Sequence, residues 1–415
     1  MNRIMVFVLL LPACLQAEES FLQVKISEPL GIARDHEYIR IRTRIQMPQD
    51  LFSTKAVIAV GKNPADTIVC QLYSQHFDPA GSLVDFIILF PISLNAKETR
   101  RLDFYWIPSF AVDKALKSDL AHRGDALSMQ VENQYYKASL GQLPDHDGVK
   151  GNLSGQLSEL LIKSGFDQKL FRTKNLMHWA PNAKRCTERR YKTLGHWNPP
   201  DNAALETGPY CIQTTRQGAL TGYPEIVISA GYEFLACKPY FLFFSVMDIQ
   251  QGLCLQRLRN DEMTMDSLFT HVAFMRQNGR ERNMLFTERY RELQEEPISN
   301  EAPWLAFYHS EKGYGFGVIR LHYSVLDQYG QTSPLAFPHT RISDGAGGGK
   351  YWNRYLICDV NTFVPAGSRY MEKNAYLTFT VDREDPLKMM RHYARVLRNP
   401  VRVRIVKPAI DFSGR

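Results

Sequence analysis

The sequence lacks most of the short motifs that assign a reaction class on their own. Its 415 residues contain no CxxC pair, no GxSxG nucleophile elbow and no GxGxxG dinucleotide fingerprint. An HExxH helix and an EF-hand loop are also missing. These absences exclude zinc-ribbon, thioredoxin-like, hydrolase-fold and NAD-dependent proteins, so the function has to be inferred from less specific patterns.

Charge of one sign and long apolar runs are scarce as well. Fifty Lys and Arg residues face 43 Asp and Glu residues, and a net charge of +7 is too small at this length to predict a nucleic-acid surface. Beyond the N-terminus no window holds about 18 uninterrupted apolar residues, which argues against a transmembrane segment. With 44% hydrophobic residues, the chain is an ordinary globular protein that can bury one or two cores.

The first 17 residues resemble a secretory signal peptide. A basic start at Arg3 precedes an apolar run over residues 4–11, and small residues follow up to Ala17. The LPAC sequence at 11–14 also resembles a bacterial lipobox, in which Cys14 would carry a lipid anchor. Either route predicts an exported protein in the periplasm or outside the cell, and cleavage after Ala17 is the favoured one.

Six cysteines remain after residue 17, and their spacing leaves the disulfide pairing open. An exported protein meets conditions in which disulfides persist. Three of the six lie in apolar, strand-like runs, where a buried free thiol is expected: Cys70, Cys237 and Cys358. The other three are Cys186, Cys211 and Cys254.

The hydrophobic pattern is that of an all-β protein. Between Tyr38 and Ile45, isoleucines alternate with arginines, and this period of two predicts a strand with one solvated face. Similar segments recur throughout the chain, with turn residues between them, at 56–60, 67–73, 83–90, 101–106, 129–136, 225–235, 239–248, 304–308, 314–323, 355–360, 375–381 and 401–406. So many strands without helices between them predict antiparallel sheets packed face to face.

Few helices are expected, and the domain boundary is soft. Asp385 and Pro386 form a predicted N-cap and first turn, and the apolar spacing that follows predicts a helix over residues 386–398. A charged connector lies near 108–128. The chain is therefore predicted to form a small N-terminal β-sandwich-like region over residues 20–110 and a larger domain over residues 125–415.

Several segments resemble the core hairpins of galactose-mutarotase-like β-supersandwich proteins: GPY at 208–210, TRQG at 215–218, YEFLACKPYF at 232–241, VPAGSRY at 364–370 and NAYL at 374–377. The resemblance covers residues 125–382. This group contains aldose epimerases, sugar-binding modules and domains of polysaccharide lyases. The resemblance implies an antiparallel β-supersandwich that holds a poly- or oligosaccharide on the concave face of its large sheet, and no nucleic-acid partner.

Two His-Trp dipeptides within twenty residues form the first candidate site. Indole rings stack on sugars, and imidazoles hydrogen-bond them or exchange protons near neutral pH. β-Elimination on a uronic acid requires a group that neutralises the carboxylate, a base and an acid. The predicted catalytic residues are His178, His196, Lys192 and Tyr351, and the predicted substrate-binding residues are Asn175, Trp179, Trp197, Arg354 and Tyr355. The alternative is that these aromatic loops only close the end of a sandwich.

A second candidate is an acidic cluster of Asp261, Glu262 and Asp266 with His271. It could bind a divalent cation such as calcium, which is the only cofactor considered, or supply the acid and base of an epimerase. The alternative, which we favour, is that the carboxylates cap a short helix and that His271 belongs to the core. The leading functional hypothesis is an exported lyase-like enzyme acting on an acidic glycan. Its rivals are an epimerase that uses His271 with Asp261 or Glu262, and a non-catalytic glycan-binding protein with a platform of Trp179 and Trp197.

Overall fold

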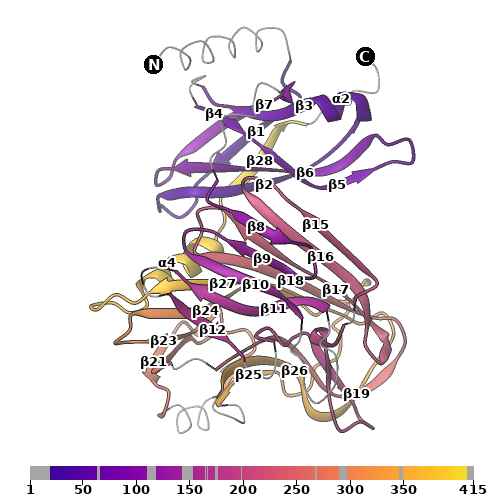
Figure 1. Ribbon diagram of the computed structural model, residues 1–415, viewed down its shortest axis with the longest axis vertical. Coiled ribbons are helices and arrows are strands. Elements are labelled where there is room, and N and C mark those ends of the chain that lie inside the picture. Colours follow the sequence, from indigo (N-terminus) through magenta and orange to yellow (C-terminus); the bar gives the residue numbers. More distant parts are fainter. Residues whose placement is uncertain are drawn as a thin grey trace. The chain divides into compact units, whose positions relative to one another are not determined.

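The computed structural model describes residues 19–62, 66–109, 118–142, 153–163, 165, 167–172, 176–197, 199–266, 269–288, 297–344 and 349–408. Strands dominate these residues and pair antiparallel in five sheets, which confirms the predicted all-β class with few helices (Figure 1). The chain forms two compact units. Unit 1 combines the residues up to Ser118 with segments 208–211 and 399–415, and unit 2 contains residues 119–207 and 212–398.

Unit 1 is a small sandwich of two sheets and one short helix, α2 (Gln49–Thr54). Alternating side chains of both sheets meet in one core that includes Val24, Ile41, Phe86 and Trp106. The five-stranded sheet has the order β28 (Arg402–Lys407), β1 (Leu22–Ser27), β7 (Thr99–Pro108), β3 (Lys55–Val60), β4 (Thr67–Val69). The three-stranded sheet has the order β2 (Arg34–Met47), β6 (Leu83–Leu94), β5 (Gln71–Phe77).

The predicted strand with alternating isoleucines and arginines forms part of β2, and Ile39, Ile41 and Ile45 lie in the core of unit 1. The C-terminal strand departs from the prediction. We assigned residues after the helix to the larger domain, whereas β28 pairs with β1 and belongs to unit 1. The prediction was wrong here because β28 and β1 are far apart in the sequence, and no local sequence pattern indicates which distant strands pair.

Unit 2 contains three sheets whose side chains share one large core. The nine-stranded sheet has the order β15 (Asn202–Glu206), β16 (Cys211–Leu220), β17 (Tyr223–Leu235), β18 (Tyr240–Ile249), β27 (Arg369–Thr380), β24 (Tyr314–Ser324), β23 (Trp304–His309), β20 (His271–Met275), β21 (Glu281–Leu285). The six-stranded sheet has the order β14 (Lys192–Thr193), β13 (Asn182–Arg185), β19 (Leu253–Met265), β26 (Lys350–Val364), β25 (His339–Asp344), β22 (Ile298–Ser299). The five-stranded sheet has the order β12 (Gln168–Phe171), β11 (Leu153–Ile162), β10 (Tyr136–Gln142), β9 (Met129–Glu132), β8 (Ala121–Gly124).

The predicted C-terminal helix is confirmed as α4 (Lys388–Leu397), which buries Met390 and Ala394. It begins two residues later than predicted, and its N-cap has no side-chain hydrogen bond. The Asp385 carboxylate pairs with Arg391 instead of capping the helix. A 3-10 turn, η3 (Leu194–His196), follows β14. Within the described ranges no helix has the length and apolar character that a membrane crossing needs.

One disulfide, between Cys186 and Cys254, joins the end of β13 to the start of β19 across 68 residues of sequence. It fastens two neighbouring strands of the six-stranded sheet. Cys70 is a buried thiol, as predicted, whereas Cys237 and Cys358, which also form no disulfide, are only half-buried. The sequence left this pairing open because the spacing of isolated cysteines does not specify which of them meet.

We expect the double variant Cys186→Ser/Cys254→Ser to lose about 2–4 kcal/mol of unfolding free energy, because a long closed loop restricts the unfolded chain. Urea unfolding without reductant measures the loss, and dithiothreitol should lower the midpoint of the wild type but not that of the double variant. An unchanged midpoint in the double variant would contradict the disulfide's stabilising role.

Candidate functional site

The described residues of the two sequence-predicted clusters separate into two regions of unit 2. One region is a polar network in the interior, and the other is the face of the six-stranded sheet that points away from the core. Asn175, a predicted substrate-binding residue, lies outside the described residues.

His178 is at the centre of the interior network and is fully buried. Its Nδ1 atom lies 2.7 Å from the Tyr232 hydroxyl, and its Nε2 atom lies 3.3 Å from the Tyr376 hydroxyl. Burial, together with the nearby charge of Arg216, lowers the pKa of His178 to about 3. The imidazole is therefore neutral at physiological pH, and both of its ring nitrogens have protein partners.

Asp261 continues this network on the opposite sheet. The backbone of β19 is bulged between Asn260 and Met263, and Asp261 there has a positive φ of 54°. Its carboxylate accepts hydrogen bonds from Arg320 Nε and Trp352 Nε1, both at 3.1 Å. The Asp261 side chain is 0% exposed, so its charge is satisfied within the protein.

Arg354 and Glu372 complete the described part of the interior network. Arg354, predicted to bind substrate, is 1% exposed and donates to the Asn300 carbonyl at 2.8 Å and to Asn260 Oδ1 at 3.1 Å. Burial, with a contribution from Asp261, raises the pKa of Glu372 to about 8. Because His178, Asp261 and Arg354 are all in the interior, none of them lies on a surface that a dissolved glycan reaches in this conformation.

The outer face of the six-stranded sheet carries arginines and tyrosines. On β19, Leu258 points into the core, and the flanking Arg257 and Arg259 point to the other side of the sheet. Tyr355 of β26 pairs in register with Arg259, and the Arg259 guanidinium carbon lies 5.4 Å from the centre of its ring. On its other side, the same guanidinium lies 4.7 Å from the Tyr191 ring.

We call this cluster the arginine–tyrosine face and define it as Arg257, Arg259, Arg341, Tyr191 and Tyr355. Arg341 is exposed on β25 and hydrogen-bonds Tyr355. Tyr351, a predicted catalytic residue, lies on the same side of β26 as Tyr355, because their separation of four residues preserves the alternation. The structure therefore brings two of the predicted residues, Tyr351 and Tyr355, to one surface.

Arg259 is held in place by its neighbours. Its Nε atom donates to Asn182 Oδ1 at 2.8 Å, and its Nη1 atom lies 3.3 Å from the Glu262 carboxylate. Asn182 also donates to Glu262, at 2.6 Å. The Arg259 side chain is only 5% exposed, so it adds fixed positive charge to this side of the sheet, while the half-buried Arg257 and the exposed Arg341 present their guanidinium groups to solvent.

Trp179 and His196 adjoin this face beside Tyr191. The Trp179 indole donates to the Tyr191 hydroxyl at 3.0 Å, and the His196 ring meets the indole edge-on at 5.5 Å. His196 Nδ1 accepts from the Thr193 backbone N–H, so the neutral ring carries its proton on Nε2. Burial and the charge of Lys192 lower the pKa of His196, while burial and Glu262 raise the pKa of Tyr191.

Neither predicted indole presents an open stacking face. Trp179 is 6% exposed and Trp197 is 2% exposed, and the Trp197 indole donates to the Ala219 carbonyl at 2.8 Å. Sequence pattern alone did not reveal this burial, because an aromatic residue in a loop can point either inward or outward. Lys192, on β14, is half-buried beside His196.

The acidic cluster does not converge on one point. Each member has its own partner: Arg320 for Asp261, Arg259 for Glu262, Arg172 for Asp266 and the Tyr308 ring for His271. No group of three or more His, Cys, Asp or Glu side chains in the described ranges is placed to share a metal ion. The helix that we favoured here is wrong, since these carboxylates lie on or just after the strand β19.

Sequence reasoning missed the central residue of this surface. Arg259 lies two residues before the acidic cluster in the sequence, but nothing near it in the sequence indicated a contact with Tyr191 or Tyr355. The available signal was weak: Arg257 and Arg259 flank a leucine, as expected for a strand with one charged face. The pairing of β19 with β26, which cannot be inferred from the sequence, brings Arg259 next to Tyr355.

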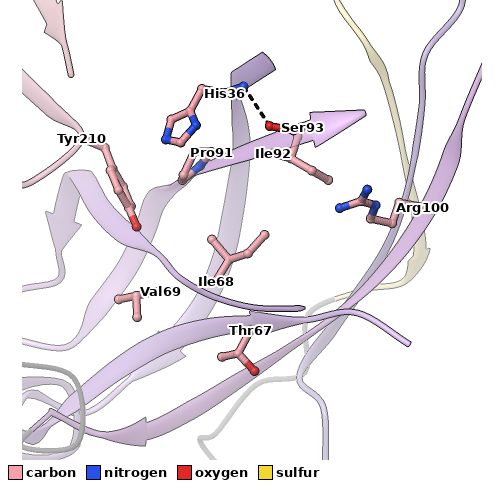
Figure 2. A pocket seen from close by; sticks show the side chains of 9 residues that line it. All are labelled: His36, Thr67, Ile68, Val69, Pro91, Ile92, Ser93, Arg100 and Tyr210. Atoms are coloured by element: carbon pink, nitrogen blue, oxygen red, sulfur yellow. Dashed lines mark hydrogen bonds between the residues drawn. The ribbon is translucent and has the colours of Figure 1, made fainter. Parts of the chain in front are cut away.

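Unit 1 has a separate pocket of about 340 Å³. Figure 2 shows Tyr210 and His36 on one side of it and Arg100 on the other, with Ile68 between them. The Gln71 amide holds the segment that carries Tyr210 through three hydrogen bonds of 2.8–2.9 Å to backbone atoms. Gly208 allows this approach, because a Cβ there would lie 2.2 Å from the Gln71 side chain. Arg100 is paired with Glu98, and among the described residues it is the only arginine or lysine that lines this pocket, whereas the arginine–tyrosine face has three arginines.

We expect His178→Gln to destabilise unit 2 by about 2–3 kcal/mol at neutral pH, because a glutamine cannot reproduce the imidazole contacts to both buried hydroxyls. The folded-state pKa of about 3 lies below the ordinary 6.5, so stability from the neutral imidazole is complete above pH 6.5 and is lost as the pH falls toward 3. The difference between wild type and variant should therefore shrink between pH 7 and pH 4 in urea unfolding. The exposed His122→Gln in the same unit is the control, and a constant difference would contradict the buried neutral state.

No family model matches the sequence, and no curated protein matches it. Solved structures do match the fold. A protein in glycosyl hydrolase family 38 from Enterococcus faecalis has a TM-score of 0.51 and 10% sequence identity, covering 94% of this chain and 48% of that one. An alpha-mannosidase from Enterococcus faecalis V583 has a TM-score of 0.50 and 11% identity, covering 93% of this chain and 46% of that one.

A GalM/aldose epimerase homologue from C. elegans overlaps less, with a TM-score of 0.34 and 11% identity over 64% of this chain and all of that one, and supports no argument. The chain thus spans about half the length of the two Enterococcus faecalis structures that it resembles. At 10–11% identity, the likeness shows a shared β-sandwich fold.

Proposed function

We propose that the protein is an exported carbohydrate-active protein that holds an acidic saccharide on the arginine–tyrosine face of unit 2. The observation that carries this proposal is the gathering of three arginines and two tyrosines on one side of the six-stranded sheet. Arg341 is exposed and Arg257 is half-buried, and the Arg259 guanidinium, fixed by Asn182 and Glu262, lies 4.7 Å from the Tyr191 ring and 5.4 Å from the Tyr355 ring.

This arrangement suits a sugar that carries a carboxylate. A fixed guanidinium binds a carboxylate through directional, charge-assisted hydrogen bonds, and a tyrosine ring packs against the C–H face of a sugar. Tyr355 is 2% exposed, so the half-buried Tyr191 and Tyr351 are the rings that a sugar can meet. Arg257 pairs with Asp359 and Arg259 with Glu262, and Arg341 adds a third cation to the face. The two structural neighbours carry sugar-hydrolase names, which supports a carbohydrate ligand at the level of fold analogy.

β-Elimination is the reaction that we propose for this face. A base takes the proton from the carbon beside the carboxylate, and the freed electron pair forms a C=C bond to the next carbon. The bond from that next carbon to the leaving oxygen breaks, and the leaving oxygen takes a proton. Arg259 would neutralise the substrate carboxylate, and Tyr191, whose raised pKa keeps it protonated, would donate to the leaving oxygen. The base stays a prediction, with His196, Lys192 and Tyr351 as its candidates.

No observation favours the epimerase alternative. His271 stacks on Tyr308 at 4.7 Å, whereas Asp261 and Glu262 are engaged by two different arginines. The third possibility, glycan binding without catalysis, uses the same arginine–tyrosine face and has to be separated from elimination by experiment.

Export is supported by two features. The signal-like residues 1–17 and Cys14 lie outside the described residues, so the route of processing and the lipid anchor stay predictions. The Cys186–Cys254 disulfide favours an oxidising compartment, because such bonds are rare where thiols are kept reduced. We therefore propose a periplasmic or extracellular location.

The test is incubation of the purified chain with polygalacturonate and other uronic-acid glycans. Elimination produces unsaturated ends that absorb in the ultraviolet. We expect Arg259→Gln to weaken binding about 30- to 100-fold, since a hydrogen bond to a charged group is worth about 2–3 kcal/mol. Tyr191→Phe keeps the packing and should reduce product formation more than binding.

Arg383 is an exposed arginine of the same unit. Its substitution Arg383→Gln should change neither glycan binding nor product formation, and it serves as the matched control. Circular dichroism establishes that each variant is folded. Binding without ultraviolet absorption in the wild type would contradict elimination and leave glycan recognition standing. A change in optical rotation of free sugars would indicate epimerisation, and failure to bind any uronic-acid glycan would contradict the proposal as a whole.

A further inference from the structure

Three neighbouring strands of unit 1 place cations directly opposite one another. In the five-stranded sheet, β28, β1 and β7 are adjacent (Figure 1), and Lys25 of β1 pairs in register with Arg404 of β28 and with Arg101 of β7. Val24 and Ile26, on either side of Lys25, are 0% exposed in the core, so Lys25 points to the solvent face. Three cations therefore form a row across the sheet, spaced by the strand separation of about 4.8 Å.

No ion pair joins this row to a carboxylate among the residues that the structure describes. Arg101 donates instead to the Gln23 amide oxygen, at 2.5 Å. Asp103, two residues along β7, is on the same face and forms no ion pair there. Like charges on directly opposite residues of neighbouring strands destabilise a sheet. A bound anion would remove this repulsion.

The same cations line a recess of about 470 Å³. Lys62 adds a fourth positive charge, and the aliphatic side chains of Ile405 and Val406, 49% and 47% exposed, form part of the wall. A carboxylated sugar chain has both carboxylates and C–H groups. The cations of the recess can bind the carboxylates, and the neighbouring apolar side chains can pack against the C–H groups. A recess lined by charge suits a flexible chain better than a bilayer, which calls for protruding apolar and aromatic groups.

We propose that the face formed by β28, β1 and β7 is a second binding surface, which takes a carboxylated polysaccharide running across the three strands. The strand separation is comparable to the length of one sugar residue, so successive carboxylates can meet successive cations. This surface lies in unit 1 and uses none of the residues of the arginine–tyrosine face. Its occupancy can therefore be measured whether or not unit 2 catalyses a reaction.

The experiment measures the affinity of the full chain for fluorescently labelled oligogalacturonate in the Arg259→Gln background, which removes the proposed contact of unit 2. At low ionic strength, adding Lys25→Ser and Arg404→Ser should weaken binding roughly tenfold, because two exposed ion pairs with the glycan carboxylates are lost. Added salt should weaken binding of the unmutated surface, because exposed charges are screened.

The matched control adds Arg44→Ser and Arg383→Ser, which lowers the net charge by the same amount at exposed positions away from this surface. It should bind as tightly as the background. Equal weakening by both pairs of substitutions would overturn the proposal, as would a background variant that binds no oligogalacturonate. Preferential binding to vesicles of anionic lipid over oligogalacturonate would overturn the choice of partner. Binding that depends on Lys25 and Arg404 but not on Arg259 would uphold this proposal while contradicting the proposed function of unit 2.

Discussion

The bulge in β19 determines where the polar side chains of unit 2 lie. By breaking the alternation between Asn260 and Met263, it sends Asp261 into the interior and leaves Arg259 and Glu262 together on the outer side of the sheet. The positive φ of Asp261 is a conformation that a non-glycine residue adopts at a cost, which the hydrogen bonds from Arg320 and Trp352 offset. In an unbroken strand, Arg259 and Asp261 would point to one face and Glu262 to the other, so Arg259 and Glu262 would not lie together.

The interior network and the outer face have different consequences. In the interior, polar groups satisfy one another, as in the contacts of His178 with Tyr232 and Tyr376, and this makes the arrangement specific and rigid. On the outer face, Arg259 is fixed by Asn182 and Glu262, and it lies on the same face as the more exposed Arg257 and Arg341. A fixed cation is prepared to bind an anion, because the cost of ordering it is met during folding.

Clustered positive charge is a property that the two units share. Unit 2 displays it on the arginine–tyrosine face, and unit 1 displays it as the row of Arg404, Lys25 and Arg101. The modest net charge of the whole chain conceals both, because carboxylates elsewhere compensate. The fold shared with sugar-processing enzymes does not determine the ligand, since one β-sandwich can support many functions, and the distribution of charge is the more specific guide.

The sequence by itself determined the fold class and many of the elements, because strand alternation and helix spacing are local properties, although β19 was not among the predicted strands. The alternating residues from Tyr38 to Ile45 form a strand, and α4 forms within one or two residues of its predicted bounds. Only the tertiary structure decided which elements meet. Pairing of β28 with β1, of Arg259 with Tyr355, and of Cys186 with Cys254 joins residues far apart in sequence. Burial was also undetermined: His178 and Trp197 lie outside the named strands in a segment rich in polar and aromatic residues, where no alternation tells which side chains point inward.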